Sequence, residues 1–209
     1  DPPVGWRVMD TRPAKAVAAA LLAKQPVRLM VDEGLPAADW LEIPKSDVSG
    51  APIVRVTTSD TDQGPNVLAL NPQVLTLGVG CERGCTPEEL STLVTVTLAD
   101  VGLAKGAIAC IASLDLKSDE EAVLDVALEL GVPARFFDAA TLEAETPRLK
   151  TPSDIVFAEV GCHGVSEGSA LAAAGPEAEL IVAKRLSKRA TCAIARAPGI
   201  IDPQNVGCA

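Results

Sequence analysis

The sequence predicts an α/β protein: a three-layer αβα sandwich on a largely parallel or mixed sheet, preceded by a smaller, partial α/β lobe. Three observations predict this fold. Short apolar runs typical of buried strands alternate along the chain with helical segments. Capping boxes or Thr-Pro pairs stand at several helix starts, and glycines follow several helix ends. The chain of 209 residues is long enough for one large domain and a small lobe.

The predicted small lobe comprises residues 1–70. Its helix is expected at Pro13–Lys24, and its strands at residues 27–31 and 52–58. A short edge strand is expected at Val67–Leu70. We expect this lobe to be incomplete, because one helix cannot cover both faces of a sheet. The chain begins with Asp1 rather than Met, so we also expect that an upstream segment was removed or left out.

The predicted sandwich comprises residues 71–197, followed by a frayed tail at residues 198–209. Capping boxes at Thr86–Glu89 and Ser118–Glu121 open its first two helices. Asp138 can cap a further turn or two. The strands are expected at residues 74–77, 107–112, 134–137, 179–183 and 190–195, and the main helices at residues 86–101, 118–131, 151–159 and 165–174.

Charge and composition exclude several classes of protein. The net charge of −10 argues against a nucleic-acid partner. A basic strip from Lys184 to Arg196 contains five cations and no acid, so it suits a small polyanionic ligand, or it is a solvated surface. Neither an apolar run of about 18 residues nor a signal-peptide pattern is present, so no membrane partner and a cytoplasmic location are expected.

The six cysteines are expected to be small buried side chains rather than disulfide partners. Cys81 and Cys85 have no second closely spaced cysteine pair to complete a zinc site, so no metal site is predicted. A reactive thiolate at Cys81, beside a helix N-terminus, is considered but not favoured.

The strongest local motif is Gly78–Gly84, which is predicted to form a turn between a strand and a helix N-terminus. Glycines in such a turn leave backbone N–H groups free for an anion. The spacing is one residue longer than the dinucleotide fingerprint, and the expected acid at the end of the next strand is missing, which disfavours a nucleotide. Tight packing alone is the alternative explanation for the glycines.

Two further segments carry groups suited to chemistry. Asp115 and Lys117 follow a strand at the sheet edge where α/β proteins bind ligands, and they can act as a general base and a carboxylate partner. His163, the only histidine, stands in a glycine-bounded segment before a helix, and its pKa range suits proton transfer. Glu167 lies in the first turns of that helix. Loop solubility, helix capping and a satisfied polar residue are the alternative interpretations.

These motifs, in this order, resemble the CbiG/CobE family of cobalamin-biosynthesis proteins. The resemblance rests on Gly78–Gly84, Ile111–Glu120, Val160–Gly168 and the closing strand Ala190–Ala195. Residues 73–196 look like the C-terminal domain of that family, and residues 5–70 look like its central region. The resemblance implies cobalt-precorrin-5A hydrolase activity, in which water opens a lactone on a corrinoid and acetaldehyde is released. Cobalt is then part of the substrate, and no separate cofactor is expected.

A lactone hydrolase needs a base, donors for an oxyanion and cations for substrate carboxylates. The catalytic candidates are therefore His163, Asp115 and Glu167. The candidate substrate-binding residues are Gly78, Gly80, Cys81, Glu82, Arg83, Gly84, Ser113, Lys117, Lys184 and Arg185.

Two other functions stay open from the sequence. Full-length members of the family have an N-terminal region without a counterpart here, whereas shorter CobE-type relatives resemble tetrapyrrole-binding proteins. A non-catalytic carrier of a corrinoid precursor is therefore the alternative to a hydrolase, and a nucleotide-binding α/β protein is the third candidate. The expected partners are the corrinoid precursor and other enzymes of the cobalamin pathway.

Overall fold

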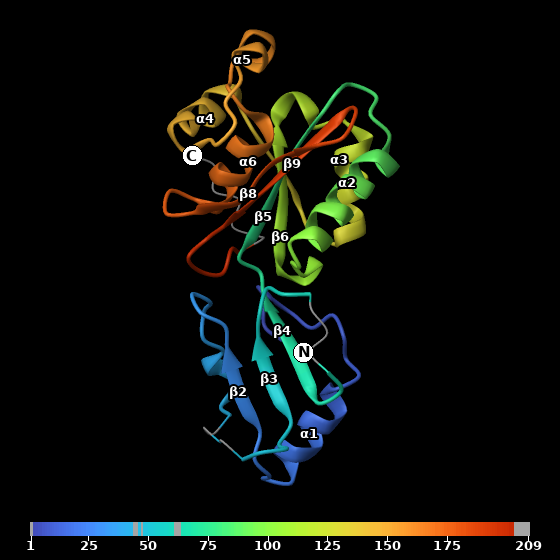
Figure 1. Ribbon diagram of the computed structural model, residues 1–209, viewed down its shortest axis with the longest axis vertical. Coiled ribbons are helices and arrows are strands. Elements are labelled where there is room, and N and C mark those ends of the chain that lie inside the picture. The colour runs from blue at the N-terminus through green and yellow to red at the C-terminus, as the bar shows by residue number, and fades with distance from the viewer. Residues whose placement is uncertain (1, 44–45, 47, 61–63, 203–209) are drawn as a thin grey trace.

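The computed structural model describes residues 2–43, 46, 48–60 and 64–202, which form two α/β lobes stacked along the long axis of the molecule (Figure 1). Residues 203–209 of the predicted tail, and residues 44–45, 47 and 61–63 between the predicted strands of the small lobe, lie outside the described residues. No helix in the described part of the chain is long and apolar enough to cross a membrane.

The large lobe contains a five-stranded sheet in the order β7-β6-β5-β9-β8. Neighbouring strands β5, β6 and β7 are parallel, and β9 runs antiparallel to both of its neighbours, β5 and β8. Four strands thus point the same way, which confirms the predicted largely parallel, mixed sheet. The strands are β5 (Leu75–Cys81), β6 (Ile108–Leu114), β7 (Ala134–Phe137), β8 (Glu179–Leu186) and β9 (Ala190–Arg196).

Helices cover both faces of this sheet, so the predicted three-layer architecture is confirmed (Figure 1). On one face lie α2 (Pro87–Asp100) and α3 (Glu121–Leu130), and on the other lies α6 (Val165–Ala174). The short helix α4 (Ala139–Ala144) packs on α6, and α5 (Asp154–Val160) projects at the top of the lobe. The short 3-10 helices are η1 (Asp39–Leu41), η2 (Lys105–Ala107), η3 (Asp115–Lys117) and η4 (Thr146–Arg148).

Side-chain caps explain where the helices α2, α4 and α5 begin. The Thr86 side chain accepts a hydrogen bond from the Glu89 amide at the start of α2, as the capping box predicted. Asp138 caps α4 in the same way by accepting from the Thr141 amide. The predicted start of α3 at Ser118 is wrong. That helix begins at Glu121, because the preceding residues form η3 and a turn.

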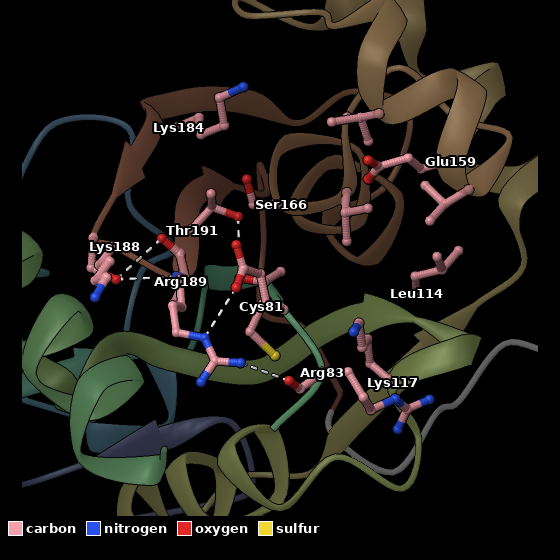
Figure 2. Close-up of a pocket in the computed structure, with 18 residues that line it drawn as sticks. Cys81, Arg83, Leu114, Lys117, Glu159, Ser166, Lys184, Lys188, Arg189 and Thr191 are labelled. Atoms are coloured by element: carbon pink, nitrogen blue, oxygen red, sulfur yellow. Dashed lines mark hydrogen bonds and ion pairs between the residues drawn. The ribbon is translucent and has the colours of Figure 1, made fainter. Parts of the chain in front are cut away.

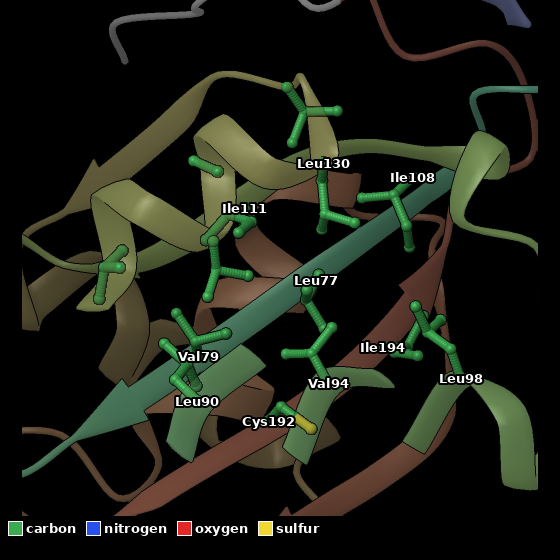
Figure 3. Packing of buried hydrophobic residues seen from close by; sticks show 14 of the residues in the cluster. Leu77, Val79, Leu90, Val94, Leu98, Ile108, Ile111, Leu130, Cys192 and Ile194 are labelled. Atoms are coloured by element: carbon green, nitrogen blue, oxygen red, sulfur yellow. The ribbon is translucent and has the colours of Figure 1, made fainter. Parts of the chain in front are cut away.

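The main core lies between the sheet and the α2–α3 layer (Figure 3). Leu77 and Val79 of β5 pack there with Leu90 and Val94 of α2 and Ile111 of β6, and all five are buried. Residues 75–80 are buried on both faces of the sheet, so β5 consists of apolar and small residues without polar alternation.

On its other face, β5 lies against the backbone of α6 at Gly78. A Cβ atom at Gly78 would overlap the carbonyl oxygen of Ser166 and would lie 2.6 Å from the amide nitrogen of Ala170. A Cβ at Gly80 would lie 2.9 Å from the hydroxyl of Thr191. Both positions therefore need glycine for close packing.

The predicted glycine-rich turn is consequently wrong over most of its length. Gly78, Gly80 and Cys81 are strand residues paired with β9, and a turn forms only where β5 ends, at Arg83 and Gly84. Their backbone groups take part in strand pairing with β9, so this segment does not have the free amides expected of an anion-binding turn.

The small lobe has a sheet in the order β1-β4-β3-β2. Its elements are β1 (Trp6–Arg7), α1 (Ala14–Leu22), β2 (Arg28–Val31), β3 (Ile53–Val56) and β4 (Val67–Pro72). The predicted strand at residues 67–70 is confirmed as part of β4 and pairs with β3. The strand is longer than predicted, and its last two residues, Asn71 and Pro72, pair with β1 on the other side. Val17 and Ala20 of α1 pack with Val54 and Val56 on one face, whereas Met30, on the other face, is exposed.

Hydrogen bonds and apolar contacts connect the two lobes. The Arg7 guanidinium donates to the carbonyl oxygen of Leu130 at 2.8 Å and also to that of Gly131. Ile200 packs against the cores of both lobes, and the Ile201 amide donates to the carbonyl oxygen of Gln73 at 3.0 Å. For residues 198–202 the predicted fraying is therefore wrong.

We predict that Gly78→Ala destabilises the protein by at least about 3 kcal/mol, because the added methyl group meets backbone atoms that cannot rotate away. Gly199→Ala is the matched control: a Cβ there meets nothing within 4 Å, so its stability should stay within about 0.5 kcal/mol of wild type. Urea unfolding followed by circular dichroism measures both. Equal midpoints for the two variants would contradict the packing of α6 on β5.

Candidate functional site

A cavity of about 460 Å³ opens at the carboxyl ends of β5 and β6 (Figure 2). Its walls come from the end of β5, the η3 segment, α5, the first turn of α6 and the β8–β9 hairpin. The carboxyl end of parallel strands is the edge at which α/β proteins bind ligands. This cavity is therefore the candidate site.

Six of the predicted substrate-binding residues line this cavity: Gly80, Cys81, Glu82, Arg83, Lys117 and Lys184. The other four lie elsewhere. Gly78 is covered by α6, and the Gly84 amide donates to Glu120 at 2.8 Å. Ser113 is buried and donates to the carbonyl oxygen of Val79 at 2.8 Å, so it links β5 to β6. Arg185 is exposed and outside the cavity lining.

One wall of the cavity carries cations held by neighbouring carboxylates. Arg83 is 2.6 Å from Asp119 and 3.2 Å from Glu120, and Lys117 is 4.0 Å from the same Glu120 oxygen. Glu120 is itself buried, and its other oxygen accepts from the Gly84 amide. A single buried carboxylate therefore fixes the turn after β5 by a hydrogen bond and lies within ion-pair distance of the two cations beside it.

The β8–β9 hairpin adds three more cations. Arg189 is 3.0 Å from Glu82 and also donates to the carbonyl oxygens of Arg83 and Gly84. Within the described residues, no carboxylate lies within 4 Å of the ammonium groups of Lys184 and Lys188. Among the described residues, the cavity therefore has two ammonium groups without an ion-pair partner.

Sequence reasoning missed part of this hairpin. Lys188 and Arg189 belong to the basic strip that the sequence shows, but they are not among the predicted site residues. The available signal was their place at the hairpin turn, since β8 ends at Leu186 and β9 begins at Ala190. Ser166 was also missed, and no sequence pattern distinguishes it from other polar residues near a helix start.

Another part of the cavity wall is apolar. It is formed by Leu114 at the end of β6, Val156 and Val160 of α5, and Val165 of α6. Glu159 is an exposed acid of α5, and its carboxylate faces into the cavity in Figure 2. The site therefore combines one cationic side with one apolar side.

Glu167, a predicted catalytic residue, is buried with 1% of its surface exposed and lies outside the cavity lining. Its carboxylate accepts hydrogen bonds from the amides of Lys150, Thr151 and Lys184 at 2.7, 3.0 and 2.8 Å, and from the Thr151 hydroxyl. Burial acts to raise its pKa, but these bonds outweigh burial, and the pKa lies below its usual value. Glu167 thus positions Lys184 beside the cavity.

His163, the second catalytic candidate, also lies outside the cavity lining. Its Nδ1 is 2.9 Å from both carboxylate oxygens of Glu143, and its Nε2 is 3.5 Å from Asp154. The ring stacks on Phe157 with a centroid separation of 4.5 Å. These contacts tie α4 to α5. Asp115, the third candidate, is exposed in η3 and does not line the cavity. The structure therefore does not bring the three together.

Cys81 lines the cavity, and burial raises its pKa to about 11 although Lys117 opposes this change. The side chain is therefore a neutral thiol near pH 7, and thiolate chemistry is not favoured. No group of three or more His, Cys, Asp or Glu side chains among the described residues is placed to hold a metal ion.

A second cavity of about 630 Å³ lies near the lobe junction and is lined by Met9, Asp60 and Asn71 among others. Its basic residue Arg12 is 2.7 Å from Asp10. It therefore offers no cluster of cations comparable to the first cavity.

Comparison with known proteins places the large lobe in a family. The sequence model described as "Cobalamin synthesis G C-terminus" matches residues 75–195, which include all five strands of the large sheet except the last residue of β9. The chain belongs to this family. The match confirms the resemblance to CbiG and CobE and assigns the chain to cobalamin biosynthesis.

Individual relatives carry two different names. The chain is 54% identical over 121 residues to protein CobE of Sinorhizobium sp., covering 58% of this chain and 79% of that protein. It is 32% identical over 133 residues to the cobalt-precorrin-5A hydrolase of Priestia megaterium, covering 64% of this chain but 35% of the hydrolase. A crystal structure of CobE, a protein from the cobalamin (vitamin B12) biosynthetic pathway, superposes with a TM-score of 0.56 at 40% identity, covering 60% of this chain and 91% of that one.

We predict that Glu167→Gln lowers the free energy of unfolding by about 3 kcal/mol at pH 7, because a neutral amide replaces a buried acceptor of four hydrogen bonds. The folded-state pKa of Glu167 is lowered, so its contribution is complete above the unfolded pKa of about 4.3 and is lost as the pH falls below it. The stability gap between wild type and variant should therefore shrink below about pH 4.3.

Urea unfolding from pH 7 to pH 3 measures this gap. Glu177→Gln, at an exposed glutamate of the same lobe, is the control and should match wild type throughout. A gap of constant size across this range would contradict an ionised Glu167.

Proposed function

We propose that this chain binds a carboxylate-rich corrinoid intermediate of cobalamin biosynthesis in the cavity at the ends of β5 and β6. The observation that carries the proposal is the pairing of a cationic wall with an apolar wall in one cavity. A corrinoid is a flat apolar macrocycle with acidic side chains at its rim. The macrocycle can pack on Leu114 and Val160, while Arg83, Lys184 and Lys188 bind rim carboxylates.

The size of the cavity supports an edge-on arrangement. Its volume of about 460 Å³ lies within the range of roughly 300–1,000 Å³ that is usual for small-molecule sites. A tetrapyrrole-derived ring is large, so we expect one edge and its acidic side chains to enter while the rest of the ring covers the mouth. The basic turn of the β8–β9 hairpin then lies beside that rim.

Cobalt-precorrin-5A hydrolase activity is the second candidate, and the 32% identity to a hydrolase favours it. In that reaction water opens a lactone and a two-carbon fragment leaves as acetaldehyde. His163 and Asp115 lie outside the cavity, so a carboxylate that activates water would come from Glu82 or Glu159 among the described lining residues. Glu82 is already paired with Arg189, which leaves Glu159 as the better base.

We therefore rank binding above catalysis for this chain. The hydrolase relative is matched over 35% of its length, whereas the relative named CobE is matched over 79% of its length at 54% identity. The three catalytic candidates from the sequence do not converge on the cavity, and its thiol is neutral.

If the cationic residues recognise the ligand, the chain should prefer corrinoids with free carboxylates, and titration calorimetry can measure this preference. The full chain should bind cobyrinic acid and bind cobinamide, in which amides replace the free carboxylates, at least about tenfold more weakly. Lys188→Met should weaken cobyrinic acid binding about threefold, and added salt should do the same. Lys15→Met, at an exposed position of α1 in the other lobe, is the control and should bind cobyrinic acid like wild type. Equal affinity for the two corrinoids would refute the cationic wall as the recognition element.

Cobalt-precorrin-5A separates the two functions. We expect the full chain to bind this compound and to release no acetaldehyde above a protein-free blank, as measured by enzymatic detection of acetaldehyde. Release over several turnovers would instead establish hydrolysis. In that case Glu159→Gln should abolish it, while His163→Gln should leave most of the activity.

A further inference from the structure

We propose that the first turn of α6 is a carboxylate subsite, in which the Ser166 hydroxyl and the Lys184 ammonium group bind one acidic side chain of the corrinoid. This inference deepens the proposed binding function and rests on it for the identity of the ligand. It adds Ser166 and the first amides of α6, which neither the sequence motifs nor the names of the relatives assign to a ligand, to the predicted substrate-binding residue Lys184.

The start of α6 has free donors at the cavity. Its N-cap is Gly164, which has extended backbone and no side chain to cap the helix. In the part of the chain that the structure describes, the amides of Val165 and Ser166 have no protein acceptor. Gly164, Val165 and Ser166 all line the cavity. The N-terminus of this helix of 10 residues also favours negative charge.

Ser166 supplies the independent observation. The residue is 2% exposed, and its Oγ has no hydrogen-bond partner among the described residues. In Figure 2 its oxygen points to a space with Lys184 on one side and Glu159 on the other. A buried hydroxyl without a partner is costly, so its place at this wall indicates an acceptor that a ligand provides.

Lys184 is fixed beside the same helix start. Its amide donates to Glu167 at 2.8 Å, and its Nζ donates to the carbonyl oxygen of Thr151 at 3.3 Å. Glu167 follows Ser166 directly, so this positioning residue links the helix start to the lysine. A neutral carbonyl partner leaves the charge of Lys184 available to a carboxylate.

Glu159 places a negative charge at the subsite, opposite in sign to the charge of Lys184. Its carboxylate faces the same space from α5, and it repels an anionic ligand. Removing its charge should therefore strengthen binding, whereas removing Ser166 or Lys184 should weaken it. A general loss of structure would weaken binding in all three variants.

The test uses the full chain and cobyrinic acid in titration calorimetry. Ser166→Ala and Lys184→Met should each weaken binding roughly tenfold, and Glu159→Gln should strengthen it about threefold. Ser91→Ala, on α2 away from the cavity, is the matched control and should bind like wild type. Wild-type affinity in both Ser166→Ala and Lys184→Met would overturn the subsite while leaving the proposed function intact.

Propionate is the second probe, because it presents one carboxylate without the macrocycle. Its addition should shift the amide resonances of Val165 and Ser166 in the nitrogen-15 spectrum, and Lys184→Met should reduce these shifts. If wild type does not bind cobyrinic acid but these resonances shift, the proposed function fails and the subsite stands. If the two amides do not respond to propionate or to cobyrinic acid, the subsite is overturned.

Discussion

The contact between the backbones of α6 and β5 is the constraint on which the site depends. Gly78 has no side chain, so the helix lies directly on the strand, with Ser166 and Ala170 above that glycine. This contact brings the first turn of α6 to the end of β5, where the strand opens into the cavity. A side chain at Gly78 would displace the helix and, with it, every group that α6 presents.

Two buried carboxylates position the cations that line the cavity of this acidic protein. Glu120 holds the turn at Gly84 together with Arg83 and Lys117, and Glu167 holds the backbone of Lys184. Each acid is buried and bound to backbone donors, so it costs less to bury than an unpaired charge. The net charge of −10 therefore does not exclude local anion binding, because Glu120 and Glu167 are buried and held by backbone amides, whereas Lys184 and Lys188 have no carboxylate within 4 Å among the described residues.

Local patterns in the sequence predicted most of the fold, and contacts between distant residues explain what they missed. Thr86 and Asp138 cap their helices as predicted, because capping depends on residues three positions apart. The prediction of a turn at Gly78 and Gly80 is wrong, because the sequence alone does not distinguish a glycine that allows a turn from a glycine that allows a helix to pack closely on a strand. Gly78 meets a helix almost ninety residues later in the chain. The site has the same limit, because Ser166 can be recognised as a site residue only once the structure shows that it lines the cavity.

The two proposed functions, binding and hydrolysis, would use the same donors at the start of α6. Backbone amides and a hydroxyl at a helix N-terminus bind a carboxylate, and the same donors can stabilise the oxyanion of an opening lactone. Catalysis needs in addition a base that reaches water in the site. His163 lies outside the cavity lining and is hydrogen-bonded to Glu143, and the carboxylate of Glu167 already accepts four hydrogen bonds. Among the described residues, the choice between the two proposed functions therefore depends on Glu159, which faces the cavity but is placed on the short helix α5 rather than on the sheet.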